Sequence, residues 1–136
     1  MCNNSLIYLA TPTTASVTSG GTMPLTTIVR RRGRSINAES DNIILSAPGY
    51  YKVTATATFT APAPGTVSLE IRKDGLAIQG LTASTTITTA TTEIRSLTIS
   101  GIVRVMCCGG AETLTIINTG EAIDVSNITF DVEYLD

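Results

Sequence analysis

The chain has 136 residues but no histidine and no tryptophan, and only 4% of its residues are aromatic. Without histidine, a serine or cysteine nucleophile lacks its commonest general base. The sequence also holds no phosphate-binding loop, nucleophile elbow or histidine-bearing metal motif. A serine-lysine or paired-carboxylate mechanism remains open on composition alone. We nevertheless expect a non-enzymatic protein with no cofactor and no bound metal.

Long apolar runs are missing as well. The first residues carry no basic region, and the apolar stretch that follows spans only about five residues, too short for a signal peptide or a membrane span. We therefore expect a protein that is made in the cytoplasm and has no membrane partner.

Cysteine is scarce. Cys2, Cys107 and Cys108 are an odd number without metal-like spacing, and a disulfide between adjacent cysteines is strained. Reduced thiols are the expectation, with the Cys107-Cys108 pair buried at a turn.

What the sequence does contain favours β-structure. Apolar residues make up 43% of the chain, threonine is abundant, and charged residues reach only 15%. The mean hydropathy of +0.26 is high for a soluble monomer, so we expect other subunits to cover part of the apolar surface. The length fits one domain.

The stretch from Gly49 to Gly75 shows the pattern most clearly. Apolar and polar residues alternate from Tyr50 to Phe59, which is the period of a half-buried strand, and Asp74-Gly75 predicts a tight hairpin. Similar short segments follow, with Gly101 as an expected bulge or kink. The sequence predicts an all-β, compact antiparallel jelly-roll sandwich of about eight to ten strands.

Residues 1–21 are interpreted as an N-terminal arm, and residues 22–136 as the jelly-roll domain. The segment from Thr11 to Gly21 is rich in Thr, Ser, Gly and Pro, which is typical of an extended arm or loop. The four apolar residues Leu6, Ile7, Tyr8 and Leu9 favour docking of this arm on a partner.

Several strands carry apolar residues on both faces, although only one face of each strand meets the core of a two-sheet sandwich. The second face would contact a partner subunit. The residues expected at such a subunit interface are Ile44, Tyr50, Val103, Ile117 and Tyr134.

Charge is unevenly distributed along the chain. Arg30, Arg31, Arg32 and Arg34 form a basic cluster, whereas the chain after Glu112 is acidic and has no Lys or Arg. The cluster either pairs with nearby carboxylates or binds an acidic protein surface, phosphate or an anionic glycan. It lacks interleaved aromatic residues and the net charge is −2, so nucleic acid is not an expected partner. The carboxylates near Asp131 either form a solvent face or hold a calcium ion on a trimer axis.

Three segments follow one another in the sequence: Asn42-Ile43-Ile44-Leu45, then PGYYKVTATATF, then a strand leading into IRKDG. This pattern resembles the globular heads of the tumour necrosis factor and complement superfamily, and most closely their bacterial and bacteriophage versions. The resemblance covers roughly residues 26–134. It implies a ten-strand sandwich assembled as a tight trimer, with both termini near one end. The sequence shows no collagen-like stalk.

These observations together predict a phage or prophage virion structural protein: a trimeric capsid decoration or head-fibre protein, anchored through Leu6 to Leu9 and the Arg30 to Arg34 cluster. Its expected location is the virion. The alternative is a receptor- or glycan-binding head of a surface fibre, which would use the loops Ala61 to Gly65 and Thr82 to Thr92.

Overall fold

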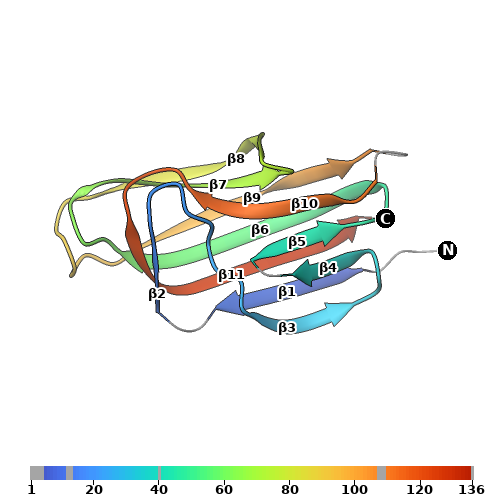
Figure 1. Cartoon of the computed structure of the whole chain (residues 1–136), viewed down its shortest axis with the longest axis horizontal. Helices are drawn as coiled ribbons and strands as arrows, with labels where there is room; N and C mark the ends of the chain where they lie inside the picture. The colour runs from blue at the N-terminus through green and yellow to red at the C-terminus, as the bar shows by residue number, and fades with distance from the viewer. Residues whose placement is uncertain (1–4, 12–13, 40, 107–109, 136) are drawn as a thin grey trace.

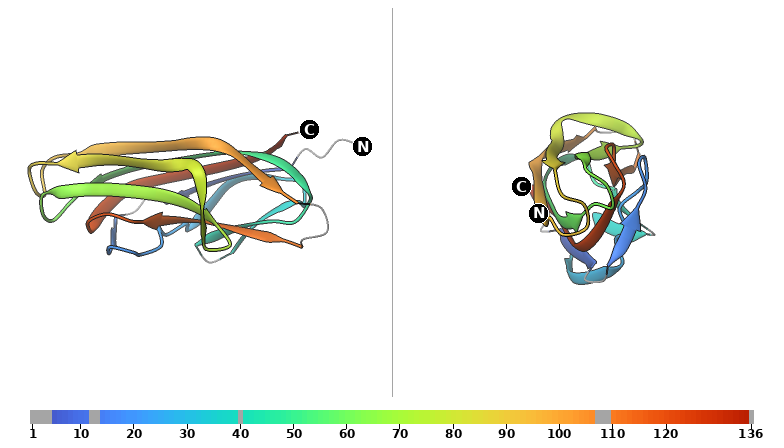
Figure 2. Two further views of the ribbon diagram at one scale, coloured as in Figure 1. Left: turned by 90° about the horizontal axis from the view of Figure 1, so that it is seen from above. Right: turned by 90° about the vertical axis from the view of Figure 1, so that its left-hand side faces the viewer.

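The computed structural model describes residues 5–11, 14–39, 41–106 and 110–135, and within them the chain forms eleven β-strands and no helix. The strands make two antiparallel sheets packed face to face (Figures 1 and 2). The predicted all-β jelly-roll sandwich is therefore confirmed, with one strand more than the upper estimate. No helix in the described residues is long and apolar enough to cross a membrane.

Sheet A contains both ends of the described chain. Its strands follow the order β3-β1-β11-β6-β9, and the short β2 pairs with β11 beside this path. Their bounds are β1 Leu6–Thr11, β2 Ala15–Val17, β3 Thr27–Arg32, β6 Gly49–Thr60, β9 Arg95–Val105 and β11 Ile123–Leu135.

Sheet B has the order β4-β5-β10-β7-β8. Its strands are β4 Ile36–Glu39, β5 Asn42–Leu45, β7 Gly65–Lys73, β8 Leu76–Ile87 and β10 Glu112–Asn118. Asp74 and Gly75 connect β7 to β8 with positive φ angles of 52° and 82°, as the predicted hairpin requires.

Alternation along β6 builds the centre of the core. Tyr51, Val53 and Phe59 are fully buried, while Lys52 between them is exposed. Burial of such side chains stabilises the fold by about 1.5–3 kcal/mol each relative to exposure. The alternation seen in the sequence thus corresponds to the inner and outer faces of sheet A.

The predicted boundary at residue 21 does not separate an arm from a domain. Strand β1 lies between β3 and β11 within sheet A, with Ile7 and Leu9 buried in the core. The physical reason is that β11 and β3 pair with the backbone of Leu6–Thr11 on both sides, while every second side chain of this strand turns into the core.

The polar segment that was read as a loop also belongs to the sandwich. Asn118, which is completely buried, donates through its side-chain nitrogen to the carbonyls of Val17, Thr18 and Glu121. Its side-chain oxygen accepts a hydrogen bond from the Gly120 amide at 3.1 Å. One amide group therefore joins the segment after β2 to the turn between β10 and β11.

Gly101 was expected to mark a bulge, but β9 pairs with β6 in continuous register through this residue. Its role is steric. The irregular pairing of β8 between Ala77 and Thr82 lets the buried Leu81 side chain reach over β9, and a Cβ on Gly101 would lie 2.4 Å from Leu81 Cδ2. Leu81 thus fills the space that glycine leaves open.

The three cysteines, Cys2, Cys107 and Cys108, lie outside the described residues, so their expected reduced and buried state stays a prediction.

We predict that Gly101→Ala lowers the free energy of unfolding by about 1–3 kcal/mol, because the added methyl group overpacks against Leu81. The same substitution in a Leu81→Ala background should cost clearly less, since the obstructing side chain is gone. Urea denaturation of the wild type, the two single variants and the double variant measures this coupling. Additive effects would contradict the steric role.

Candidate assembly and anchoring surfaces

The outer face of sheet A carries the largest exposed apolar side chains that lie together on one sheet. Tyr50 and Ile102 are 51% and 59% exposed, and Met106, which continues the alternation of β9, is 51% exposed. Strand pairing sets Tyr50 opposite Arg104, whose guanidinium lies 5.7 Å from the Tyr50 ring centroid. This cation–π contact holds the aromatic ring on the surface. We call Tyr50, Ile102 and Met106 the apolar end of sheet A.

The five residues predicted for a trimer interface do not share one surface. Tyr50 lies on the outer face of sheet A, whereas Ile44 and Ile117 are half-buried on the outer face of sheet B. Tyr134 is partly buried at the end of the sandwich, where its ring meets Tyr51 edge-on at 5.1 Å and its hydroxyl donates to the Pro48 carbonyl.

Val103 points into the core and is only 1% exposed, so it cannot contact another subunit as predicted. The Ile102-Val103 pair does place apolar side chains on both faces of β9, but Ile102 is the outward one. Its exposure follows from the register, because Val103 lies opposite the buried Tyr51 and Ile102 opposite Lys52. Sequence alternation alone left the choice between the two faces open.

The predicted anchoring segment of β1 is divided between core and surface. Ile7 and Leu9 are buried within their own chain and are not available to a partner. Leu6 and Tyr8 are half-buried on the outer face of sheet A, where Tyr8 lies between Arg30 of β3 and Asp131 of β11.

The predicted basic cluster forms an exposed edge. Arg30, Arg31 and Arg32 belong to β3, all six residues of which are exposed, and Arg34 follows in the turn toward β4. The side-chain ion pairs of the described residues are Arg72–Glu70, Lys73–Glu112 and Arg95–Glu93. Arg30, Arg31 and Arg34 belong to none of these three ion pairs, whereas Arg32 has an interaction partner of its own. For Arg30, Arg31 and Arg34, the expected pairing with nearby carboxylates is therefore not seen among the described residues.

Hydroxyl groups cover the middle of the same outer face. Across β6 and β9, Thr58 and Ser96 lie 2.9 Å apart, and the pairs Thr56–Thr98 and Thr54–Ser100 lie 3.3 and 3.4 Å apart. Such cross-strand pairs stabilise the sheet by about 0.2–1 kcal/mol each. The threonines and serines of β6 and β9 therefore make the middle of the outer face of sheet A an uncharged surface.

Asp131 and Glu133 line a shallow hollow of about 100 Å³ beside Lys52 and Thr54. Partial burial raises the pKa of Asp131, and the charge of Glu133 raises it further. Within the described residues no group of three or more potential ligands could hold a metal ion. The predicted possibility of calcium therefore has no support in the single chain.

The two loops of the alternative hypothesis lie at one end of the sandwich, away from the termini (Figure 1). Residues up to Ile87 belong to β8, so only residues 88–94 form a loop here. The Thr91 amide donates to the Ala61 carbonyl at 2.8 Å, which joins this loop to the one between β6 and β7.

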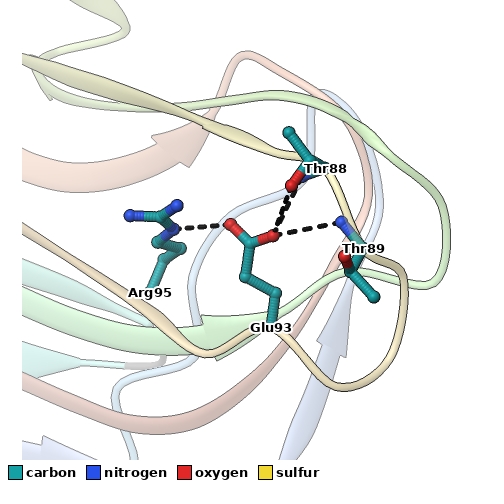
Figure 3. A network of polar contacts seen from close by, with 4 residues as sticks. All are labelled: Thr88, Thr89, Glu93 and Arg95. Atoms are coloured by element: carbon teal, nitrogen blue, oxygen red, sulfur yellow. Dashed lines mark hydrogen bonds and ion pairs between the residues drawn. The ribbon is translucent and has the colours of Figure 1, made fainter.

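Glu93 organises the loop of residues 88–94 (Figure 3). Its Oε1 accepts hydrogen bonds from the Thr88 amide, the Thr88 hydroxyl and the Thr89 amide, and its Oε2 accepts one from Arg95 Nε at 2.6 Å. Arg95 chiefly, and then the threonines, lower the pKa of Glu93 to about 2, from its ordinary value of 4.5. The loop is thus built around a carboxylate that stays charged.

We predict that NMR titration of the Glu93 carboxyl carbon gives a midpoint near 2. Because the folded-state pKa is depressed, the stabilisation is complete above about pH 4.5 and is lost as the pH falls toward 2. Arg95→Gln removes the main cause and should shift the midpoint upward. A wild-type midpoint near 4.5 would contradict this network.

Comparisons with known proteins give structural relatives only. No protein-family model matches the sequence, and a search of curated proteins finds no relative. Three solved structures share the fold: Eiger TNF from S. frugiperda (TM-score 0.76, 10% identity, covering 98% of this chain and 92% of that one), murine APRIL (0.69, 16%, 98% and 100%) and the PRD1 vertex protein P5 (0.64, 14%, 100% and 100%). At these identities the likeness concerns the fold alone.

The matches also include the globular domain of a zebrafish complement protein. Together with the strand order of the two-sheet sandwich, they agree with the resemblance seen in the sequence. The chain has the jelly-roll fold shared by tumour necrosis factors and complement globular heads.

Proposed function

We propose that the protein is a non-enzymatic structural component of a phage or prophage particle, a trimer that acts as a capsid decoration or head-fibre protein. The observation that carries this proposal is the similarity to the PRD1 vertex protein P5, which spans the full length of both chains. The other similar structures are ligands and complement heads, so the fold by itself does not decide between the roles.

The outer face of sheet A supports the trimer. The apolar end of sheet A, which also contains Lys52 opposite Ile102 and Arg104 opposite Tyr50, adjoins the hydroxyl-lined middle of the same face around β6 and β9. Exposed apolar clusters of this kind mark interaction sites in soluble proteins. Burial of such a surface in an obligate assembly removes it from water and accounts for the high mean hydropathy.

We predict that the purified protein runs at three times 14.2 kDa in size exclusion coupled to light scattering. Ile102→Glu should convert it to monomers, because it removes an apolar contact and burying the new carboxylate costs more desolvation energy than its pairing with Lys52 on the opposite strand returns. Ile94→Glu is the matched control, since Ile94 is similarly exposed, at 68%, but precedes β9.

A monomeric wild type would remove the trimer from the proposal. A trimer that survives Ile102→Glu but not Ile94→Glu would move the interface to the loop end of the sandwich.

The virion role has its own test. We expect the protein to be present in particles purified by density gradient from the phage or induced prophage that carries the sequence, and to be detected there by mass spectrometry. Its complete absence from intact particles, with the protein found free in the lysate, would contradict a structural role in the virion.

A recognition head is the second candidate function. The hydrogen bond between Thr91 and Ala61 brings the two predicted recognition loops together at one end, and Glu93 braces one of them. Their lack of Trp and Tyr leaves no aromatic platform for stacking a sugar. Cell adsorption that is lost after substitutions in residues 61–65 and 88–92, with particle attachment unchanged, would favour this role.

A further inference from the structure

We infer that β3 is a docking edge for an extended acidic segment of another protein, which adds to sheet A as a further antiparallel strand. The segment carries carboxylates opposite Arg30 and Arg31 and an apolar side chain near Ile28. In the proposed function, the acidic segment belongs to the virion protein on which this protein is anchored. Only the identity of the protein that carries the segment rests on that proposed function.

The first support is the unpaired backbone. Among the described residues β3 pairs with β1 along one side only, with a bulge at Val29, and it ends sheet A at the lower rim of the molecule in Figure 1. The Val29 carbonyl accepts a hydrogen bond from Arg30 Nη1. All six of its residues are exposed. The outward N–H and C=O groups of such an edge form a ready template for another strand.

The second support is the charge of this edge. Arg30 lies on the outer face of sheet A opposite Tyr8, and Arg31 lies on the inner side opposite Ile7, where it donates to the Asn37 side chain. A strand added beside β3 would therefore meet a guanidinium on each of its faces. Opposite charges directly across two strands stabilise the pair, and like charges destabilise it.

This charge pattern also selects among occupants. A second copy pairing antiparallel through its own β3 would set the arginines opposite Thr27, Ile28 and Val29, without a carboxylate for any of them, and would gather the arginines of both chains in one pair of strands, which disfavours self-association at this edge. A nucleic acid would gain the charge attraction but could not pair with the free backbone, and the edge offers no exposed aromatic platform. An acidic polypeptide satisfies both the charge and the backbone.

The third support is a hollow of about 380 Å³ between the edges of the two sheets. Leu9, Leu25, Ile28 and Ala38 form its apolar lining, and Glu39 and Asp41 add carboxylates. Ile28 faces this hollow from β3 while remaining 47% exposed. The inner-face side chain of an added strand opposite Ile28 would enter here, and the two carboxylates exclude an acidic residue at that position.

The edge therefore prefers acidic residues opposite Arg31 and Arg30 and an apolar residue opposite Ile28. Because Val29 forms a bulge, a segment running antiparallel to β3 passes it without a residue of its own, and the predicted order is Thr-Glu-Glu-Leu-Thr from its N-terminus. The probe is this pentapeptide with blocked ends and a fluorescent label. Three control peptides replace both Glu by Gln, the Thr after Leu by Pro, or Leu by Asp.

Fluorescence anisotropy with the purified full-length protein measures binding. We expect each control peptide to bind at least about fivefold more weakly, since Gln removes the charge, Pro removes a backbone donor, and Asp meets Glu39 and Asp41. Binding should also slow amide hydrogen exchange in β3 but not in β9, the other edge of sheet A.

The protein variant Arg30→Gln/Arg31→Gln should weaken binding of the acidic peptide about tenfold, since two exposed ion pairs are lost. The matched control is Arg104→Gln on β9, which leaves β3 unchanged and should bind normally. Thermal unfolding of both variants establishes that the comparison is made between folded proteins.

Equal binding of the Pro and Thr peptides would overturn strand addition and leave only charge attraction. Equal binding by Arg30→Gln/Arg31→Gln and wild type would overturn the arginine edge, and so would protection of β3 amides that grows with protein concentration without peptide. Peptide binding by a protein absent from particles would support this inference while contradicting the virion role.

Discussion

The pairing of β1 with β11 is the contact on which the rest of the structure depends. It joins the first described residues to the last, with Leu6 opposite Glu133 and the Tyr134 amide donating to the Ser5 carbonyl at 2.9 Å. Because β1 lies inside sheet A, it buries Ile7 and Leu9 and also carries β3 on its other side. Contacts this distant in sequence close long loops and are expected to form late in folding.

Alternation in the sequence predicted the fold class, the inward face of β6 and the hairpin at Asp74-Gly75, because a two-residue period and a turn preference are local properties. It failed for the first 21 residues. Whether Leu6–Thr11 forms an arm or an inner strand depends on a partner strand more than a hundred residues away, and no local pattern encodes that pairing. Asn118 shows the same limit, since its role requires two chain segments about a hundred residues apart to meet.

The candidate surfaces were predicted in part for the same reason. Arg30 to Arg34 could be recognised as a cluster from composition, but only the sheet order shows that Arg30 and Arg31 lie on the outermost strand of sheet A. Tyr50 was correctly placed on an outer face by alternation. Val103 was not, because Ile102 and Val103 are equally apolar and only pairing with β6 decides which one is buried.

The two proposed surfaces can operate in one assembly because they lie at opposite margins of sheet A. Strand order separates β3 from β6 by β1 and β11, which places the arginine edge about 14 Å from the strand of Tyr50 at the usual spacing of neighbouring strands. The outward side chains between them are partly charged, with Asp131 and Glu133 on β11. A subunit seated on the apolar end would thus exclude water around β6 and β9, while the hydrogen-bonding groups of β3, which point away from the sheet in its own plane, would remain open to a different chain.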